Sequence, residues 1–429
     1  MNDMVSSKAP FLAFAPEHWN LSRVKFLADK LYKGSGITKE DVLEDGNTPC
    51  VRYGEIYSTY NQSFTECRSK TQVERIDSPR FFEHNDILFA GTGELIEEIG
   101  KSVVYIGEER CMAGGDIIVM HHSQEPRFLN YLLNCAYVQA QKSHDKYKLK
   151  VVHISDTSIG NMKVYMPDLR EQTIIADYLD SKCAAIDEAI ERHKIIIEKL
   201  EEYRQSIIAF AVRNGIDPNA RMKDSGLPWI GQIPEHWTVK PNKYIFSKVK
   251  EIVPEYTNEN ILSLTLNGVI VRNDAEFKGK KATSYDGYQR CYKGNLLMCL
   301  FDIDVTPRCV GLINDVGITS PAYTQFRVNE NDDPAFYYYY YLSLDYTKTL
   351  LHLSKNIRNS MTADDFGRIY AVEPPKEEQQ AIAAYLREKC QAISQAIERN
   401  KAPIKKLEEY RKSIIYQAVT GKIDCWDKA

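Results

Sequence analysis

The sequence lacks the features of several large protein classes. Its 429 residues include ten cysteines without a CxxC pair or a Cys/His cluster, and its nine histidines show no HxH or HExxH spacing. This pattern argues for reduced thiols, as in the cytoplasm, and against structural zinc. No apolar run reaches the ~18 residues that a membrane-spanning helix needs. The first ten residues have no basic segment followed by an apolar one, so we expect a cytoplasmic protein without a signal peptide.

Motifs for catalysis and cofactor binding are also missing. Gly93 and Gly100-Lys101-Ser102 do not have the GxxxxGK(S/T) spacing of a phosphate-binding loop. Glu373-Pro-Pro-Lys376 lacks the aromatic residue that ends the Asp/Asn/Ser-Pro-Pro motif of amino-methyltransferases. The net charge of −4 gives no overall basic signature, so a surface that binds nucleic acid has to be local. The sequence therefore predicts no catalytic residues, no metal site and no cofactor bound by this chain.

What the sequence does contain is a long internal repeat. Glu171–Val212 and Glu378–Val419 align without a gap, and about 27 of the 42 positions are identical. In both copies isoleucine and leucine recur at three- and four-residue steps, which predicts two helices with the narrow apolar seam of a coiled coil. Two equal seams in one chain are most simply paired with each other. The seam residues are Ile186, Ile190, Ile197, Leu200 and Ile207 in the first copy and Ile393, Ile397, Ile404, Leu407 and Ile414 in the second.

A second repeated motif sets the order of the segments. Pro16-Glu-His-Trp19 returns as Pro234-Glu-His-Trp237, and Val212–Asp217 after the first helix is similar to Val419–Asp424 after the second. The order is cyclic, so the last residues should lie near the first. We predict an α+β fold in which two globular mixed α/β domains are joined by two long antiparallel helices that form a coiled coil with pseudo-two-fold symmetry. The predicted segments are a loose N-terminal arm (1–15), a first domain (16–166), a long helix (167–212), a linker (213–233), a second domain (234–373), a second long helix (374–420) and a tail (421–429).

Two features of the second repeat lead to separate predictions. Pro403 stands where the first copy has Ile196, and a proline inside a helix predicts a kink or break near 399–402. The tyrosine run within 334–342 aligns with the predicted helix at 126–133. This alignment favours a packed helix over a platform on which bases stack.

The duplicated frame resembles the DNA-specificity subunit of type I restriction–modification systems. The resemblance rests on the PEHW motif, the pattern EQxxIAxYLxxK followed by LEEYRxSII, and the junction KDSGLPWIGQIPEHW at 223–237, and it covers essentially the whole chain. It implies two target-recognition domains that bind the halves of a split double-stranded DNA sequence, in a subunit that is not itself catalytic. It also implies two methyltransferase subunits that use S-adenosylmethionine to form N6-methyladenine. In some such phage-defence systems two restriction/translocase subunits that use ATP and Mg join them.

The predicted geometry agrees with this resemblance. A helix of ~40 residues is ~60 Å long, and one turn of DNA is ~34 Å. Two domains carried by such helices could reach half-sites about one turn apart. Outside the repeated frame the two domains hardly match, which predicts an asymmetric target.

Candidate DNA contacts follow from residue type and loop position. Arginine and asparagine can bind guanine and adenine edges through paired hydrogen bonds, whereas lysines mostly contact phosphates. Arg358 is the strongest single candidate, because 357–360 aligns with the end of a lysine-rich loop (142–150) and His153. For the loop lysines, simple solvation is the alternative. The candidates are Lys33, Ser35, Arg52, Tyr53, Lys146, Lys148, Lys150 and His153 in the first domain and Arg272, Lys278, Lys280, Lys281, Arg308, Tyr323, Arg358 and Asn359 in the second.

The long helices carry a repeated group of residues outside the seam. An intramolecular coiled coil requires only its seam, so this second repetition fits two equivalent docking surfaces, one for each methyltransferase. The alternative is a pair of solvated helix faces stabilised by ion pairs within one helix. The repeated residues are Glu201, Glu202, Tyr203 and Arg204, and then Glu408, Glu409, Tyr410 and Arg411.

Functions from other classes stay open at this point. A coiled-coil adaptor with paired protein-binding modules would show no salt-sensitive DNA binding. A self-contained methyltransferase or nuclease is disfavoured by the missing motifs. A milder alternative is the specificity subunit of a methylation-only or defence complex without a nuclease.

Overall fold

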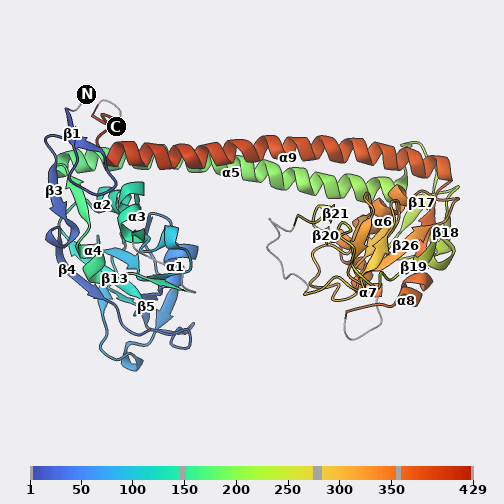
Figure 1. Ribbon diagram of the computed structural model, residues 1–429, viewed down its shortest axis with the longest axis horizontal. Coiled ribbons are helices and arrows are strands. Elements are labelled where there is room, and N and C mark those ends of the chain that lie inside the picture. Colours follow the sequence, from blue (N-terminus) through green and yellow to red (C-terminus); the bar gives the residue numbers. More distant parts are fainter. Residues whose placement is uncertain (1–2, 145–150, 274–282, 354–358, 427–429) are drawn as a thin grey trace. The chain divides into compact units, whose positions relative to one another are not determined.

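The computed structural model describes residues 3–144, 151–273, 283–353 and 359–426, and it divides into two compact units. Unit 1 comprises Met1–His193 and Ala402–Ala429, and unit 2 comprises Lys194–Lys401. Two long helices, α5 (Leu169–Asn214) and α9 (Lys376–Val419), contribute to both units (Figure 1). In the described part of the chain, no helix is both long and apolar enough to cross a membrane.

Helices α5 and α9 pack against each other in an antiparallel pair, as predicted. In unit 1 the beginning of α5 shares a hydrophobic core with the end of α9, and in unit 2 the end of α5 shares one with the beginning of α9. Arg411 forms an ion pair with Asp187, and the Arg204 guanidinium donates to the Ser394 hydroxyl at 3.0 Å. Arg204 matches Arg411 in the repeat and Asp187 matches Ser394, so both contacts join the same two repeat positions. The pairing is therefore pseudo-symmetric at the level of single side chains.

A carboxylate in the first turn of α5 explains the first PEHW motif. In unit 1 the Trp19 indole N–H donates to Glu171 Oε1 at 3.1 Å, and His18 Nε2 lies 3.1 Å from Glu171 Oε2. The next residue, Gln172, accepts from the Glu125 backbone N–H at 3.1 Å, just before α2 (Pro126–Asn134) begins. The Glu-Gln pair thus joins the helix start to two other segments of unit 1.

Unit 2 repeats these bonds with its own residues. The Trp237 indole N–H donates to Glu378 Oε2 at 3.0 Å, and His236 Nε2 lies 2.7 Å from the same oxygen. Gln379 accepts from the Asp333 backbone N–H at 2.7 Å, just before α6 (Pro334–Tyr346) begins. The two units therefore share one frame, in which PEHW and the first turn of the following long helix are bonded together.

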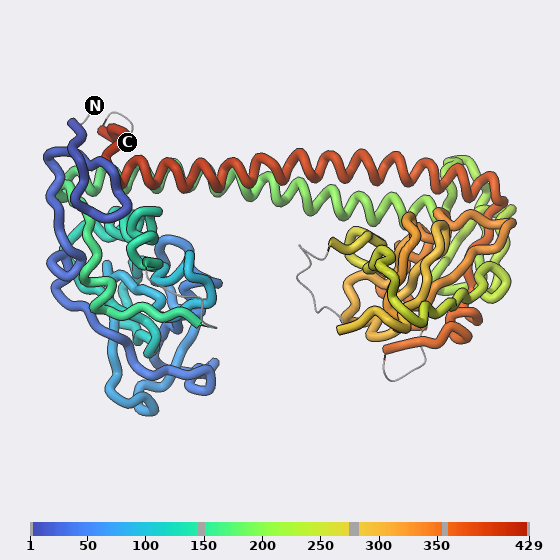
Figure 2. Tube along the Cα trace, in the orientation of Figure 1, coloured from blue at the N-terminus to red at the C-terminus, as the bar shows by residue number. Residues whose placement is uncertain are grey.

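Each long helix ends at a glycine that packs on a PEHW motif. Gly421 follows α9 with φ +66°, and a Cβ there would lie 2.2 Å from Cγ of Pro16. Gly215 follows α5 with φ +73°, and a Cβ there would lie 3.4 Å from the Trp237 ring. Glycine is the residue best suited to this left-handed conformation. Because α9 ends on the first PEHW motif, the two termini lie side by side in unit 1, and the predicted cyclic order is confirmed (Figure 2).

The prediction of a loose N-terminal arm is wrong. Strand β1 (Met4–Ser6) pairs with β2 (Phe14–Pro16), and Ala9 and Leu12 are buried in the unit 1 core. The equivalent hairpin of unit 2, β16 (Met222–Asp224) with β17 (Gln232–Pro234), occupies part of the predicted linker. Both hairpins lead directly into PEHW, so they belong to the repeated frame.

Unit 1 has a five-stranded sheet whose two faces bury alternate residues, as the period of two in a strand requires. Ile87 and Phe89 face α2 and α3 (Ala136–Ser143), whereas Leu88 and Ala90 share a core with Ile56 of α1 (Tyr53–Ser58). The order is β4 (Ala28–Lys33), β13 (Ile117–His122), β9 (Ile87–Ala90), β11 (Ser102–Tyr105) and β6 (Ser63–Phe64). The second sheet has the order β7 (Ser69–Thr71), β5 (Thr48–Val51), β12 (Cys111–Ala113) and β8 (Phe81–Phe82). The remaining elements are β3 (Asn20–Arg23) paired with β15 (Lys163–Met166), β10 (Thr92–Gly93) paired with β14 (Val152–His153), and α4 (Asp156–Gly160).

Unit 2 keeps the frame but has a different interior. Strand β18 (Thr238–Pro241) pairs with β27 (Tyr370–Glu373), as β3 pairs with β15 in unit 1. The central sheet is smaller and antiparallel, with the order β19 (Phe246–Val249), β26 (Thr324–Val328), β23 (Leu296–Met298) and β24 (Val310–Leu312). Other elements are the pairs β20 (Leu262–Thr265) with β21 (Gly268–Val271) and β22 (Gln289–Cys291) with β25 (Gly317–Thr319), and helices α7 (Thr349–Leu353) and α8 (Ala363–Arg368).

The tyrosine run forms the packed helix α6, as the alignment with α2 predicted. Tyr337, Tyr340 and Tyr341 are fully buried, and Tyr337 donates to the Val372 carbonyl at 3.2 Å. Phe336 packs edge-on against Trp237 as Phe128 packs against Trp19. These rings are core residues and have no free faces on which bases could stack.

The break predicted near 399–402 does not occur, because α9 runs through Pro403 as one helix, and the kink stays a prediction. Proline removes one backbone hydrogen bond and crowds the preceding turn, at a cost of ~3 kcal/mol in a helix interior. Buried Ile397 and Ile414 lie on either side of Pro403 on the paired face. Packing on both sides therefore holds the helix together across the proline.

Replacing Pro403 should stabilise the protein. Pro403→Ala gives residue 403 a backbone N–H that can donate to the Arg399 carbonyl, and it removes the ring. We therefore expect a higher midpoint of thermal unfolding and a gain of ~1–3 kcal/mol in the free energy of unfolding. Ile196→Ala is the control at the matched position of α5, where the side chain is exposed and no backbone bond changes. Equal midpoints for the native chain and Pro403→Ala would contradict the strain at this position.

One lysine of the predicted loop at 142–150 is a core residue. Lys142 lies in α3 and is fully buried; its Nζ donates to the Gly100 carbonyl at 2.6 Å and lies 5.7 Å from the centre of the Phe89 ring. Burial lowers the pKa of Lys142 to about 7. Lysine in the unfolded chain titrates near ~10.4, so the folded state disfavours the protonated form. The buried lysine therefore lowers the free energy of unfolding by its full amount below pH 7, and this loss is relieved as the pH rises from 7 towards 10.

Lys142→Met should therefore change stability in a pH-dependent way. We expect the variant to unfold at a higher temperature than the native chain at pH 6, where the native lysine is protonated. Near pH 9.5 this advantage should shrink or reverse, because the neutral lysine still supplies the donor for Gly100. The free energy of unfolding of the native chain should rise by a few kcal/mol relative to the variant between these pH values, at ~1.4 kcal/mol per pKa unit. Lys406→Met, at an exposed site on α9, is the control and should show no such trend. If the difference in unfolding temperature between Lys142→Met and the native chain were constant across this pH range, Lys142 would not carry a destabilising buried charge.

Candidate nucleic-acid interface

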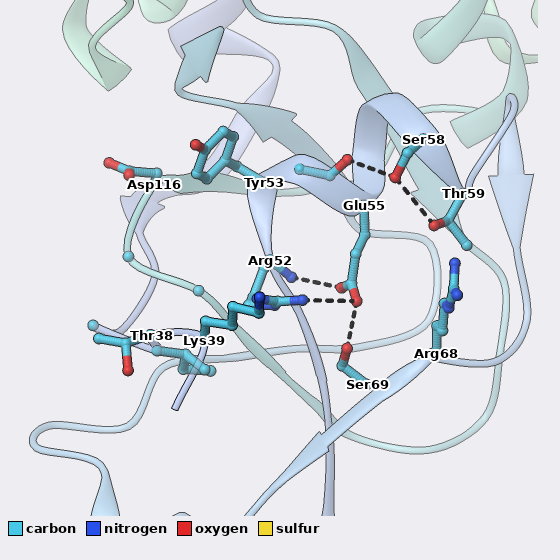
Figure 3. A pocket seen from close by; sticks show the side chains of 15 residues that line it. Thr38, Lys39, Arg52, Tyr53, Glu55, Ser58, Thr59, Arg68, Ser69 and Asp116 are labelled. Carbon is cyan, nitrogen blue, oxygen red and sulfur yellow. Dashed lines mark hydrogen bonds and ion pairs between the residues drawn. The ribbon is translucent and has the colours of Figure 1, made fainter. Parts of the chain in front are cut away.

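Unit 1 contains a cavity of about 1020 Å³ beside α1 (Figure 3). Its walls come from the loop at 36–39, the residues that begin and end α1, the start of β7 and the turn at 114–116. Glycines form part of these walls, and a Cβ added at Gly36 or Gly54 would meet nothing within 4 Å. The site is open to ligands at both glycines.

The cavity is organised around a buried carboxylate. Glu55 is 6% exposed and closes the first turn of α1 by accepting from the Arg52 backbone N–H at 2.8 Å. This is one half of a capping box, a motif that ties the residue before a helix to its third residue. The Ser69 hydroxyl donates to the other oxygen, Glu55 Oε1. The Arg52 guanidinium lies 3.9 Å from that oxygen as well, so carboxylate and guanidinium form a loose ion pair inside the cavity.

The chemistry of the lining suits nucleic acid. Lys39 and Arg68 are exposed cations at the cavity, and Tyr53 is a 38% exposed aromatic ring. Hydroxyl groups of Thr38, Ser58 and Thr59 add donors and acceptors. Cations, an aromatic face and hydroxyl groups are the side chains that contact phosphates, bases and sugars in DNA complexes.

Two of the predicted contacts, Arg52 and Tyr53, line this cavity, whereas Lys33 and Ser35 do not. Lys33 is exposed at the end of β4. Ser35 is 4% exposed; its hydroxyl accepts from the Arg80 N–H at 2.5 Å and donates to the Ser78 carbonyl at 3.2 Å. A buried hydroxyl with both roles filled has no surface to offer DNA, so the prediction for Ser35 does not hold.

The other candidates of unit 1 belong to the segment before β15. His153 is exposed in β14, and its Nδ1 lies 3.0 Å from the Thr92 hydroxyl. Lys146, Lys148 and Lys150 lie outside the described residues.

The described candidates of unit 2 have different neighbours. Arg272 lies over the Tyr285 ring at 5.2 Å, and Arg308 lies over the Tyr346 ring at 5.1 Å and donates to the Leu266 carbonyl at 3.2 Å. Tyr323 is half-buried and stacks on Phe301, and the Asn359 carbonyl accepts from the Ile303 N–H at 3.0 Å. Lys278, Lys280, Lys281 and Arg358, the strongest candidate from the sequence, lie outside the described residues.

Most residues of the unit 1 cavity were missed from the sequence, among them Glu55, Lys39, Arg68 and Ser69. Glu55 had a usable signal, because a glutamate three residues after a helix-preceding residue is typical of a capping box. Lys39, Arg68 and Ser69 had none, since they reach the cavity from other segments of the chain.

Comparison with known proteins shows what this chain is similar to. Residues 16–202 match the family model described as the type I restriction modification DNA specificity domain. This part of the chain is therefore similar to the DNA-specificity domain of type I restriction–modification systems. The match includes the first PEHW motif, the whole interior of unit 1 and most of α5.

Two curated relatives cover different shares of the chain. It is 25% identical over 426 residues to a Methanocaldococcus jannaschii protein described as the specificity subunit of the type I restriction enzyme MjaX, covering 95% of this chain and 94% of the relative. The specificity subunit of StySPI from Salmonella potsdam is 23% identical over 223 residues, or 50% of this chain and 47% of the relative. A solved chain from work on the assembly and conformational transition of the type I R-M system has a TM-score of 0.70 at 15% identity, covering 95% of this chain and 99% of that one. At that identity the likeness concerns the fold.

The repeated group on the two long helices divides into two kinds of residue. Tyr203 and Tyr410 are 54% and 53% exposed, nearly the same in both copies. Arg204 and Arg411 turn towards the neighbouring helix, where they contact Ser394 and Asp187. The arginines therefore serve the helix pair, and the tyrosines are the ones presented to solvent.

Some glutamates of this group form ion pairs and others are exposed. Glu201 pairs with Arg204 at 3.2 Å, and Glu202 pairs with Lys199 at 2.8 Å, so part of the group forms ion pairs within one helix, as the alternative interpretation expected. Glu408 and Glu409 are exposed. Among the described residues, no group of three or more His, Cys, Asp or Glu side chains could hold a metal ion.

Proposed function

We propose that this chain is the DNA-recognition subunit of a type I restriction–modification complex and carries out no chemistry itself. Units 1 and 2 each bind one half of a split, asymmetric sequence. Two methyltransferase subunits, which carry S-adenosylmethionine, dock on the subunit and methylate adenine at N6. Two ATP-dependent restriction subunits complete the complex in systems that also cleave DNA.

The observation that carries this proposal is the contrast between a repeated frame and two different interiors. Two kinds of bond recur in both units. The indole of PEHW donates to the glutamate of the following long helix, and the glutamine beside that glutamate accepts from the backbone N–H that precedes α2 or α6. The interiors differ in the number and order of their strands. A frame built twice suits a partner that binds twice, and different interiors suit two different DNA half-sites.

The exposed tyrosines support docking of that partner on the long helices. Tyrosine is enriched at the centres of protein interfaces, where it buries a large rigid ring and keeps a polar tip. Tyr203 and Tyr410 are equally exposed at equivalent repeat positions. Two equal anchors fit two copies of one partner.

An adaptor that binds protein through both units is the second candidate. The frame alone would serve such a role as well, because a coiled coil can carry any pair of modules. The basic and aromatic cavity of unit 1 favours DNA over protein.

The proposal is tested by mapping methylated adenines. The chain is expressed with a candidate type I methyltransferase subunit in cells that lack adenine methylation, and N6-methyladenine is located by single-molecule sequencing. We expect one motif with two defined halves and a fixed gap of unspecified bases. The methyltransferase expressed without this chain is the control and should leave no such motif.

The result that favours the adaptor is equally specific. If the methyltransferase is folded and co-purifies with the chain but no adenine is methylated, DNA recognition is not the function. Methylation of a single continuous motif would refute the assignment of one half-site to each unit.

Removing the exposed tyrosines should weaken docking without unfolding the protein. We expect Tyr203→Ala with Tyr410→Ala to leave the unfolding midpoint within about 1 °C, because exposed side chains contribute little to stability. The amount of methyltransferase that co-purifies should fall at least tenfold, the loss typical of an interface anchor. Phe210→Ala is the control: this ring is 61% exposed on the same helix, but its repeat equivalent is Gln417. An equal loss for Phe210→Ala would show that the repeated tyrosines have no special role.

A further inference from the structure

Arg52 stands out in the unit 1 cavity because its guanidinium, on a side chain that is 31% exposed, has one long ion pair and no hydrogen bond to a described side chain or carbonyl. Its Nε is buried, and no described residue accepts a hydrogen bond from it. The guanidinium contact with Glu55, at 3.9 Å, is an ion pair longer than a hydrogen bond. Buried donors without acceptors are rare in folded proteins, because burial removes the water that would otherwise satisfy them. Such a donor in a lined cavity points to a ligand that supplies acceptors.

The neighbouring carboxylate indicates what kind of acceptor fits. Glu55 is buried beside the guanidinium, so the pair carries no net charge. A phosphate placed against Arg52 would also approach the Glu55 carboxylate, and the two anions would repel each other. The edge of a nucleobase is neutral and needs directed donors rather than net charge. Exposed Lys39 and Arg68 are better placed for phosphates, since no carboxylate is bonded to either one in the described structure.

We infer that Arg52 binds guanine in the half-site recognised by unit 1. Arginine donates two parallel hydrogen bonds to O6 and N7 of guanine, and this is the commonest base-specific contact in protein–DNA complexes. Glu55 is the positioning residue, because its oxygens hold both the Arg52 backbone N–H and the guanidinium. Ser69 holds Glu55 in turn through its hydroxyl. This inference rests on the proposed function and adds the identity of one base.

The cavity wall next to Arg52 is shaped for close approach. Gly54 follows Arg52 by two residues in the first turn of α1, and a Cβ there would project into open space. Gly36 is open in the same way on the facing loop. Neither glycine has a positive φ, so the backbone does not require glycine at either position. The absence of side chains leaves room for a ligand beside the guanidinium.

Arg52→Gln is the main test, read by the same methylation mapping. Glutamine donates to N7 and accepts from N6 of adenine, so we expect adenine to replace guanine at one position of one half-site. Arg52→Ala should accept other bases at that position, with discrimination against them falling about tenfold or more. The other half-site and the gap should stay unchanged in both variants, which also shows that the protein is folded.

Two further substitutions separate positioning from a purely structural role. Glu55→Gln keeps an acceptor for the Arg52 N–H but removes the charge that orients the guanidinium. We expect it to relax the same base position that Arg52→Ala relaxes. Gly54→Phe fills the cavity and leaves Arg52 and Glu55 in place, so methylation should be lost. Gly54→Ala is its matched control; it favours the helix and should keep the native motif.

The outcomes distinguish this inference from the proposed function. A native chain that yields no split motif refutes the proposed function. A native split motif without guanine in either half, or one that Arg52→Gln leaves unchanged, refutes the inference alone. If Arg52→Ala lowers methylation equally at all sequences and reduces the salt dependence of DNA binding, Arg52 contacts a phosphate and the inference is wrong. Arg68→Ala should show that phosphate behaviour.

Discussion

The rest of the molecule depends on a hydrogen-bonded carboxylate in the first turn of each long helix. Glu171 and Glu378 accept from the indole N–H of Trp19 and Trp237, and a histidine lies against each carboxylate. A buried tryptophan needs an acceptor for its N–H, and an ionised acceptor makes the stronger bond. The bond fixes where the helix begins relative to the strand that follows PEHW. The following glutamine then fixes the start of α2 or α6.

This arrangement separates the part of the sequence that builds the frame from the part that varies. Tryptophan, carboxylate, amide and terminal glycine occupy the same positions in both units, and a change in any of them would leave a buried polar group unpaired or a backbone strained. The strands between them pack on the core of this frame but have strand pairings of their own in each unit. They can therefore differ in number, order and surface chemistry while the helices stay paired. This combination suits the proposed function, in which one partner docks twice and two unlike half-sites are recognised.

The cavity of unit 1 shows how such an interior acquires chemistry. The capping box that begins α1 is an ordinary device for starting a helix, but its glutamate is buried beside an arginine. The result is a neutral pair with unused, directed donors, surrounded by exposed cations from other segments. In our proposal, electrostatic attraction from the surrounding lysine and arginine contributes affinity that does not depend on sequence, and the oriented donors contribute discrimination between bases. One short helix would then serve folding and recognition together.

The sequence was sufficient wherever a signal is periodic or repeated. The seam residues, the antiparallel pair, the cyclic order and the packed tyrosine helix all follow from spacing and self-alignment, because burial in a helix imposes a fixed period. Predictions from the sequence were wrong for residues whose burial or bonding depends on neighbours far along the chain. Lys142 is buried under Gly100, Ser35 is bonded to the segment at 78–80, and α9 continues through Pro403 because both sides of the proline are packed.

The sequence by itself determined the duplicated frame, the pairing of the two helices and the resemblance to type I specificity subunits, since these are properties of patterns within segments. Only the tertiary structure decided which side chains meet. Arg204 and Arg411 turn inward while Tyr203 and Tyr410 face solvent, a distinction of about one-quarter of a helical turn that residue type alone does not reveal. Likewise, Arg52 and Tyr53 gain Lys39, Arg68 and Ser69 as neighbours through strand pairing, whose register depends on contacts between distant segments.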